Sequence, residues 1–261
     1  MVQPFILRRD KKSVLQDLPD KIERNYYSGL TAEQKTVYLA YLQQMREEVS
    51  GMDSEAFRKS RISILAGLTR LRQICCDPRL FLDDYEGSSG KLEQVKMLVK
   101  TAIENKRRVL LFSQFTGMLS ILEEVFAEMD ISTFYLRGST PPKDRVEMVN
   151  AYNAGEKEVF LISLKAGGTG LNLTGADTVI LYDLWWNPAV EEQAAGRAHR
   201  MGQKNVVEVW RMIAEGTIEE RMDALQQEKR ELFQKVIQGN ETQLQQLTEE
   251  DIRLILSMGD E

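Results

Sequence analysis

The sequence has little of what metal centres and disulfide frameworks require. Its 261 residues include two cysteines and one histidine, and the cysteines, Cys75 and Cys76, are neighbours. Adjacent cysteines rarely form a disulfide, and one histidine without a second cysteine cluster cannot supply an ordinary zinc site. We therefore expect both thiols to act as small apolar residues on a helix in a reducing compartment, and we expect no metal site.

Long hydrophobic runs are also missing. The sequence contains no run of about 18 apolar residues that could cross a membrane, and no apolar stretch of signal-peptide length follows the basic residues at positions 8–12. We therefore expect an intracellular protein with no membrane partner. The net charge of −6 does not exclude nucleic acid, because a binding groove needs only a few local cations and backbone N–H groups.

A complete nucleotide site is missing too. No G-x-x-x-x-G-K-[ST] loop occurs, so no lysine of such a loop can hold ATP phosphates. None of the strands predicted below ends in paired acids suited to magnesium. The sequence thus offers arginines that could contact a nucleotide but no cradle of its own for one.

The first 90 residues predict helices. Apolar residues recur at helical spacing over residues 31–52, where Thr31 and Gln34 form a capping box and Gly51 is a stop signal. A second helix is predicted over residues 54–76. The acidic and glycine-rich stretch 83–90 is typical of a linker.

From residue 91 to 214 short apolar runs alternate with helices. The predicted strands are 109–112, 132–136, 159–163, 178–182 and 206–212, and the predicted helices between them include 92–105, 118–129 and 143–153. This alternation predicts an α/β fold with a doubly wound, mostly parallel sheet. Ligands bind such sheets outside the carboxyl ends of the strands. Charged helices at 218–238 and 249–256 either brace a neighbouring lobe or are simply solvated.

One helix, predicted over residues 188–201, has signals at both ends. Asn187 suits the N-cap, Pro188 the first helical position and Gly202 the C-terminal cap.

On that helix Gln193, Arg197 and Arg200 fall at positions i, i+4 and i+7. Two guanidinium groups stacked on one face repel each other. Their spacing therefore indicates a bound polyanion such as phosphate, which arginine grips with a fork of donors. A solvated arginine face is the alternative.

Polar residues follow three other predicted strands. Residues 163–173 contain Gly167, Gly168 and Gly170, which allow the backbone to approach a ligand closely. Residues 113–116 and 137–140 carry small hydroxyl and amide groups. These can hold phosphate oxygens, or they can cap helices, which is their commoner use.

Together these segments resemble the second, C-terminal lobe of the Swi/Snf family of superfamily 2 helicase-like ATPases. The matching elements are Phe5-Ile6-Leu7-Arg8-Arg9 with Leu18-Pro19 and Lys21, Leu71-Arg72-Gln73-Ile74-Cys75 with Pro78, residues 109–116, Gly138-Ser139-Thr140 with Arg145, residues 165–173, and residues 183–203. Asp77 stands where the family usually has histidine.

The resemblance implies a motor of two RecA-like lobes. Residues 1–90 would be a linker and helical protrusion, 91–214 the second RecA-like lobe, and 215–261 C-terminal helices. ATP and Mg²⁺ would be bound mainly by a first lobe that precedes residue 1, so the chain alone is expected to be inactive.

The resemblance also assigns roles to residues. Arg197 and Arg200 would be arginine fingers, with Gln193, Gly168 and Gly170 nearby on the nucleotide. The residues expected to contact the DNA backbone are Ser113, Gln114, Ser139, Lys165 and Trp186. The implied partners are double-stranded DNA, the first lobe of the same polypeptide and a DNA-bound protein complex, in an intracellular, DNA-associated setting.

Two other functions stay open. The chain could be a lobe of a strand-separating or RNA-dependent helicase, although Trp185-Trp186-Asn187-Pro188 and the helical insertion at 31–77 favour the Swi/Snf reading. It could instead be a nucleotide-binding module without catalysis, which tight ATP binding by the chain alone would indicate.

Overall fold

The computed structural model describes residues 18–164, 170–235 and 247–257, with side chains up to residue 228 in the second of these ranges. Within these ranges no helix is long and apolar enough to cross a membrane.

The centre of the molecule is a parallel sheet. In the described part of the chain it has six strands in the order β1-β6-β5-β2-β4-β3, and every neighbouring pair is parallel. The strands are β1 (Lys21–Ser28), β2 (Val109–Ser113), β3 (Thr133–Leu136), β4 (Val159–Ser163), β5 (Thr178–Leu181) and β6 (Val207–Ala214). The predicted α/β fold with a doubly wound parallel sheet is confirmed.

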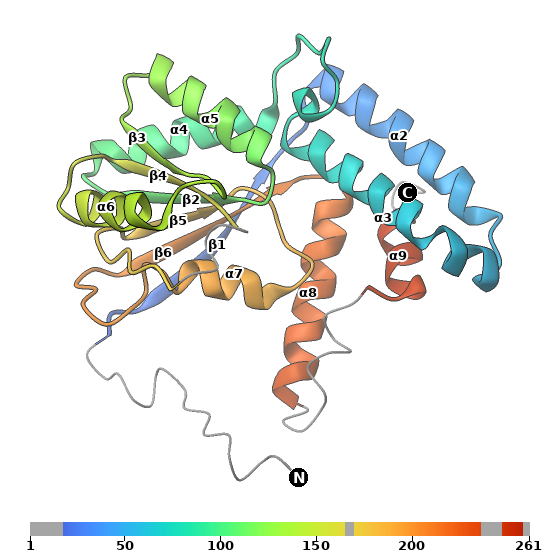
Figure 1. The fold of residues 1–261 in the computed structure, drawn as a ribbon. Coiled ribbons are helices and arrows are strands. Elements are labelled where there is room, and N and C mark those ends of the chain that lie inside the picture. The colour runs from blue at the N-terminus through green and yellow to red at the C-terminus, as the bar shows by residue number, and fades with distance from the viewer. Residues whose placement is uncertain (1–17, 165–169, 236–246, 258–261) are drawn as a thin grey trace.

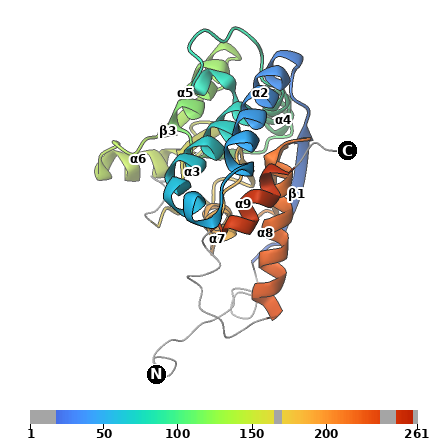
Figure 2. The ribbon, with the colours of Figure 1, turned by 90° about the vertical axis from the view of Figure 1, so that its right-hand side faces the viewer.

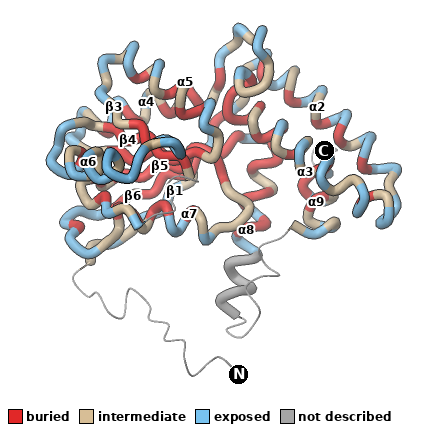
Figure 3. Tube along the Cα trace, in the orientation of Figure 1, coloured by how far each residue is buried: buried red, intermediate tan, exposed pale blue. Residues whose placement is uncertain are grey.

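Helices cover both faces of the sheet, as the continuous apolar strands require. Along β2, Val109 and Leu111 pack into the core shared with α4 (Gly90–Glu104) and α5 (Thr116–Glu128). Leu110 and Phe112 point the other way, into the core shared with α6 (Pro142–Asn153) and α7 (Pro188–Ala195). Figure 1 shows these two layers of helices, and Figure 3 shows the buried strands between them.

A third core lies beside the sheet and is made by four helices. These are α2 (Ala32–Ser50), α3 (Ser54–Cys76), α8 (Ile218–Lys235) and α9 (Glu249–Leu256). Their buried apolar residues form one cluster with Leu184 and Ile213 from the sheet side. Figure 2 looks at this side, with all four helices toward the viewer. The C-terminal helices therefore pack on the helical protrusion of the same chain.

Strand β1 was not predicted. It pairs in parallel with β6, from Lys21 beside Val207 to Ser28 beside Ala214. The chain thus contributes an edge strand to the sheet before it enters α2 and α3. The proposed division into linker with protrusion, RecA-like lobe and C-terminal helices stays a prediction, and β1 adds a strand from the first of these segments to the sheet.

The prediction of one helix over residues 188–201 is correct for the first half of this range and wrong for the second half. Its start is as predicted: Asn187 is the N-cap, its side chain accepts from the Ala189 N–H at 3.0 Å, and Pro188 is the first helical residue. However, α7 ends at Ala195 with Gly196 as its C-cap. Gly202 has a φ of 98° and closes a later turn instead of capping this helix.

Candidate functional site

Two of the polar segments singled out in the sequence, those that follow β2 and β5, meet at one edge of the sheet. Ser113 is the last residue of β2, and Asp183 comes two residues after β5 ends. These two strands are hydrogen-bonded neighbours and run parallel, so their carboxyl ends lie side by side. This is the edge at which ligands bind doubly wound sheets.

Asp183 is the hub of a buried polar cluster at this edge. It accepts hydrogen bonds from the Ser113 hydroxyl, from the Gln114 backbone N–H at 3.2 Å and from the Gln114 side-chain amide at 2.5 Å. Burial raises the pKa of Asp183, although Arg72 and the hydrogen bonds from Ser113 and Gln114 all favour its charged form. Ser113 is 0% exposed and Gln114 is half-buried. The two predicted DNA contacts therefore share a fixed acceptor.

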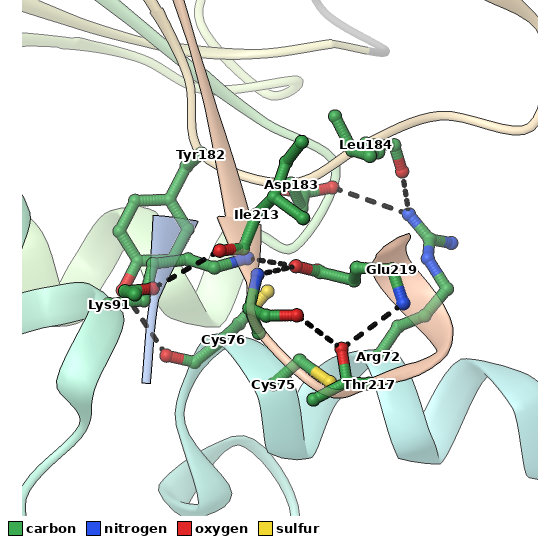
Figure 4. A network of polar contacts seen from close by, with 12 residues as sticks. Arg72, Cys75, Cys76, Lys91, Tyr182, Asp183, Leu184, Ile213, Thr217 and Glu219 are labelled. Carbon is green, nitrogen blue, oxygen red and sulfur yellow. Dashed lines mark hydrogen bonds and ion pairs between the residues drawn. The ribbon is translucent and has the colours of Figure 1, made fainter. Parts of the chain in front are cut away.

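Arg72 enters the same cluster from α3, in the helical protrusion. Its Nη1 donates to the Gln114 side-chain oxygen at 3.0 Å, its Nη2 lies 3.6 Å from an Asp183 carboxylate oxygen, and Nη2 also donates to the Leu184 carbonyl. Figure 4 shows the guanidinium reaching both Asp183 and Leu184. Because Arg72 is 1% exposed, these contacts form in a nearly dry environment and tie α3 to the edge of the sheet.

The Trp-Trp-Asn-Pro segment is held on both sides. The Arg72 guanidinium lies 5.0 Å from the ring centre of Trp186, which is half-buried and packs against the helical core. The backbone N–H of Trp185 donates to Glu191 at 2.9 Å, and its carbonyl accepts from Gln226 on α8. This loop is consequently anchored to α3 by one tryptophan and to α8 by the other.

A second set of charges holds α7 and α8 to the sheet. Arg211 on β6 donates to Glu191 at 3.1 Å, to Gln226 at 2.6 Å and to Asp223. Although burial works to lower the pKa of Arg211, Glu191 and Asp223 raise it. Glu191 lies in the first turn of α7, where a negative charge is favoured.

Arg197 and Arg200 do not lie on α7, contrary to the prediction, but in the turns that follow it. Tertiary hydrogen bonds shape these turns. The Arg197 carbonyl accepts from the Leu173 N–H at 3.0 Å, and Arg200 Nη1 donates to the carbonyls of Gly170 at 3.1 Å and Leu171 at 3.2 Å. The arginine turn and the end of the glycine-rich segment are therefore side by side.

Gln203 locks this arrangement. Its side-chain amide donates to the carbonyls of Ala176 at 2.7 Å and Ala198 at 3.1 Å, and its side-chain oxygen accepts from the N–H groups of Lys204 and Asn205, both at 2.9 Å. One buried side chain thus joins the segment after the glycines to the arginine turn. No separate role was predicted for Gln203.

Arg197 and Arg200 have no acidic partner among the described residues. Arg197 is 5% exposed, and burial, followed by the like charge of Arg200, lowers its pKa. Neither guanidinium forms an ion pair within the part of the chain that the structure describes. A bound anion at these two guanidinium groups stays a prediction.

The other predicted site residues are placed as follows. Gln193 is exposed on α7, and Gly170, whose carbonyl accepts from Arg200, is exposed as well. Ser139 is exposed in the turn after β3, whose shape is set by Arg145 donating to the carbonyls of Thr140 at 2.7 Å and Gly138 at 2.9 Å. Lys165 and Gly168 lie outside the described residues.

Below this edge an ion pair joins α4 to α8. Lys91 lies 2.6 Å from Glu219, and both side chains are 0% exposed. Glu219 also accepts from the Ala214 N–H at 2.8 Å. Although burial works to lower the pKa of Lys91, Glu219 raises it above its ordinary value. Figure 4 shows this pair beside Cys75 and Cys76.

Both cysteines are buried and free, on the last turn of α3. Burial raises the pKa of the Cys75 thiol to about 12. Within the described residues no group of three or more metal-binding side chains is found.

Two protein families match the chain. Residues 90–202 match the family described as helicase conserved C-terminal domain, and residues 1–80 match the SNF2-related domain. The ISWI chromatin-remodeling complex ATPase ISW1 of Saccharomyces cerevisiae is 37% identical over 257 residues, which cover 94% of this chain and 23% of that protein. The chain spans about a quarter of the length of the curated relatives it matches.

Two solved structures from Sulfolobus solfataricus are similar. The C-terminal domain of a SWI2/SNF2 ATPase has a TM-score of 0.72 and 30% identity, covering 92% of this chain and 100% of that one. The SWI2/SNF2 ATPase core in complex with dsDNA has a TM-score of 0.75 and 32% identity, covering 99% of this chain and 55% of that one.

Proposed function

The chain belongs to the Swi/Snf family of ATP-dependent helicases and remodellers, as its C-terminal, RecA-like lobe, and on this premise we propose that it is half of a motor that moves along double-stranded DNA. The other half would be a first lobe of the same polypeptide, which would bind ATP and Mg²⁺. Hydrolysis would then depend on closing the two lobes over the nucleotide.

The observation that carries this proposal is the arginine turn. Arg197 and Arg200 present two guanidinium groups without an acidic partner among the described residues, and Arg200 is oriented by the carbonyls of Gly170 and Leu171. A pair of arginines without an acidic partner suits the γ-phosphate of a nucleotide held by another lobe. Such arginine fingers contribute about 10³–10⁵ in rate.

Catalysis by this chain would be electrostatic. The negative charge on the transferring phosphoryl oxygens would be stabilised by guanidinium groups already fixed in place, so little reorganisation is needed at the moment of reaction. Gln193, exposed on α7, and the glycine segment around Gly168 and Gly170 would line the same nucleotide. When bound, ATP would supply the phosphoryl group, and Mg²⁺ would supply positive charge that offsets the negative charge on its oxygens.

The DNA would lie on the opposite side of the cleft from the nucleotide, across the edge of the sheet at which β2 and β5 end. Gln114 and Trp186 are half-buried and Ser139 is exposed, so each can meet a phosphate or a sugar from its place in the fold. Lys165 would add a cation. Ser113 is committed to Asp183, and it would contact DNA only by giving up that bond. Contacts of this kind position a duplex without reading bases, so binding would be sequence-tolerant and weakened by salt.

A strand-separating helicase lobe is the second candidate, because one similar protein, from Mycoplasma pneumoniae, is named an ATP-dependent helicase. The anchored Trp-Trp-Asn-Pro loop and the helical protrusion favour translocation on duplex DNA. The complete two-lobe protein should move along a duplex and displace a bound protein without releasing single strands. Release of a labelled strand would support the helicase function instead.

The deciding experiment is ATP hydrolysis by the complete two-lobe protein, with and without duplex DNA. We expect DNA to stimulate hydrolysis and Arg200→Ala to lose about 10³-fold or more of the stimulated rate while still binding ATP. Lys204→Ala, an exposed cation four residues away, should hydrolyse normally and serves as the control. If Arg200→Ala hydrolyses ATP as fast as the unmodified protein, the finger assignment is wrong.

Tight ATP binding by this chain alone would favour a nucleotide-binding module.

A further inference from the structure

One side chain of the helical protrusion touches two of the residues expected to hold DNA. Arg72 donates to the Gln114 side-chain oxygen at 3.0 Å, and its guanidinium lies 5.0 Å from the ring centre of Trp186. These two residues come from different strand-end segments, after β2 and after β5. Gln114 and Trp186 are thus linked through an arginine that belongs to neither segment.

Arg72 is too buried to contact DNA itself. Its side chain is only 1% exposed. Beyond Gln114 and Trp186 it reaches the Leu184 carbonyl, the Asp183 carboxylate at 3.6 Å and, at 5.6 Å, the ring of Phe115. We infer that Arg72 is a positioning residue that fixes Gln114 and Trp186 relative to each other for binding the DNA backbone. This inference rests on the proposed function.

The chemistry of arginine suits this role. Its planar guanidinium can donate along separate directions to Gln114, Leu184 and Asp183 while its face stacks on an aromatic ring. A lysine ammonium could keep the charge beside Asp183, but it cannot form the same fork and stack at once. The position is also stiff, because the buried face of α3 packs with α2 and α8 in the helical core.

The expected consequence is specific to DNA binding. Without Arg72, Gln114 keeps its bonds to Asp183 and Trp185 keeps its bonds to Glu191 and Gln226. The Gln114 oxygen and the Trp186 ring, however, lose the partner that fixes them relative to each other. Fixing them when DNA binds would weaken binding. For Arg72→Met we expect the duplex concentration that half-saturates ATP hydrolysis to rise about tenfold. The rate at saturating DNA should stay within about twofold, because the arginine turn is untouched. Arg72→Lys should fall between the unmodified protein and Arg72→Met.

The test uses the complete two-lobe protein and titrates duplex DNA in the hydrolysis assay, with thermal melting measured alongside. Arg253→Met is the matched control. Arg253 also bonds to backbone carbonyls, of Val49 and Met52, and lies over a ring, that of Phe57 at 5.2 Å, but it does not reach the sheet. It should lower the melting temperature without changing the half-saturating DNA concentration.

Each outcome decides the inference. A raised half-saturating concentration in Arg72→Met, or in Arg72→Lys if the methionine variant does not fold, with a normal rate at saturation, would support it. If the folded Arg72 variants only melt earlier, as Arg253→Met does, Arg72 is structural and the inference fails while the proposed function stands. Absence of DNA stimulation in the unmodified protein would overturn the proposed function, and this inference with it.

Discussion

Arg200 lies close enough to Arg197 for its positive charge to lower the pKa of Arg197, although burial is the larger cause of that lowering. A positive group that is 5% exposed, beside a second positive group, weakens the folded state unless an anion is present. Residues selected for stability alone would not be arranged in this way. This pair therefore opposes folding in the free chain and would favour it when phosphate is bound.

Arg197→Met should separate these two effects. Because the substitution removes a buried like-charge contact, we expect the free energy of unfolding of the chain to stay the same or to rise by about 0.5–2 kcal/mol. Hydrolysis by the complete protein should fall about 10³-fold. Urea unfolding and steady-state hydrolysis provide the two measurements. A clear loss of stability would mean that Arg197 has a structural partner.

The ion pair between Lys91 and Glu219 should behave in the opposite way. Lys91→Met leaves a buried carboxylate without its cation, so we expect a loss of about 3–5 kcal/mol in the free energy of unfolding. The double variant with Glu219→Gln should lose less than the sum of the single variants. Lys59→Met, at the exposed pair with Glu55, should change stability by less than about 1 kcal/mol. Equal losses at the two sites would contradict this account.

The buried thiols predict a loss of stability in alkali. Burial raises the pKa of Cys75 from 9.0 to about 12. The folded chain therefore keeps a proton that the unfolded chain releases above about pH 9. The contribution of Cys75 to the free energy of unfolding is complete below pH 9. It disappears as the pH approaches 12, at up to about 1.4 kcal/mol per pH unit.

Folding raises the pKa of Lys91 as well. The contribution of Lys91 to the free energy of unfolding is therefore complete below its ordinary pKa of 10.5 and is lost as the pH rises through its pKa in the folded chain. Unfolding measured by urea at several pH values between 8 and 11 should show this slope. Cys75→Ala should make it shallower, and an unchanged slope would show that folding does not raise the pKa of Cys75.

Gly90, the first residue of α4, is required by a close approach. A Cβ atom at Gly90 would lie 1.9 Å from the carbonyl oxygen of Gly29. Because backbone must move to relieve this clash, we expect Gly90→Ala to cost about 1–3 kcal/mol. Gly51→Ala is the matched control, since nothing lies within 4 Å of its Cβ and its φ is −86°. It should be neutral or slightly stabilising, as thermal melting would show.

Elements whose ends carry local signals were predicted well. The start of α2 is set by the Thr31–Gln34 capping box, which the structure confirms, and α3 and α9 match their predicted ranges. Strand β1 was missed because charged residues such as Glu23 and Arg24, exposed within this edge strand, leave it no continuous apolar run. Local sequence therefore defines helices with clear caps better than it defines polar edge strands.

The sequence predicted which residues belong to the site, but not which of them contact each other. Polar residues after β2 and β5 could be placed at one edge from the strand pattern alone. Arg72 could not be assigned its role, because its partners Gln114 and Leu184 are 42 and 112 positions away in the sequence. The end of α7 was misplaced for a similar reason. The bond between the Leu173 N–H and the Arg197 carbonyl comes from a separate segment.

The pairing of β1 with β6 has a consequence for how the chain folds. Lys21 lies beside Val207, so one edge of the sheet closes only when segments from distant parts of the sequence meet. Contacts of such long range slow folding, because loop-closure entropy must be overcome before they form. During synthesis the strands β2 to β5 can associate first, while β1 and the apolar faces of α2 and α3 wait for β6 and α8 to emerge. The growing chain would then expose those faces for longer than the rest of the lobe, and they are where a chaperone would be most useful.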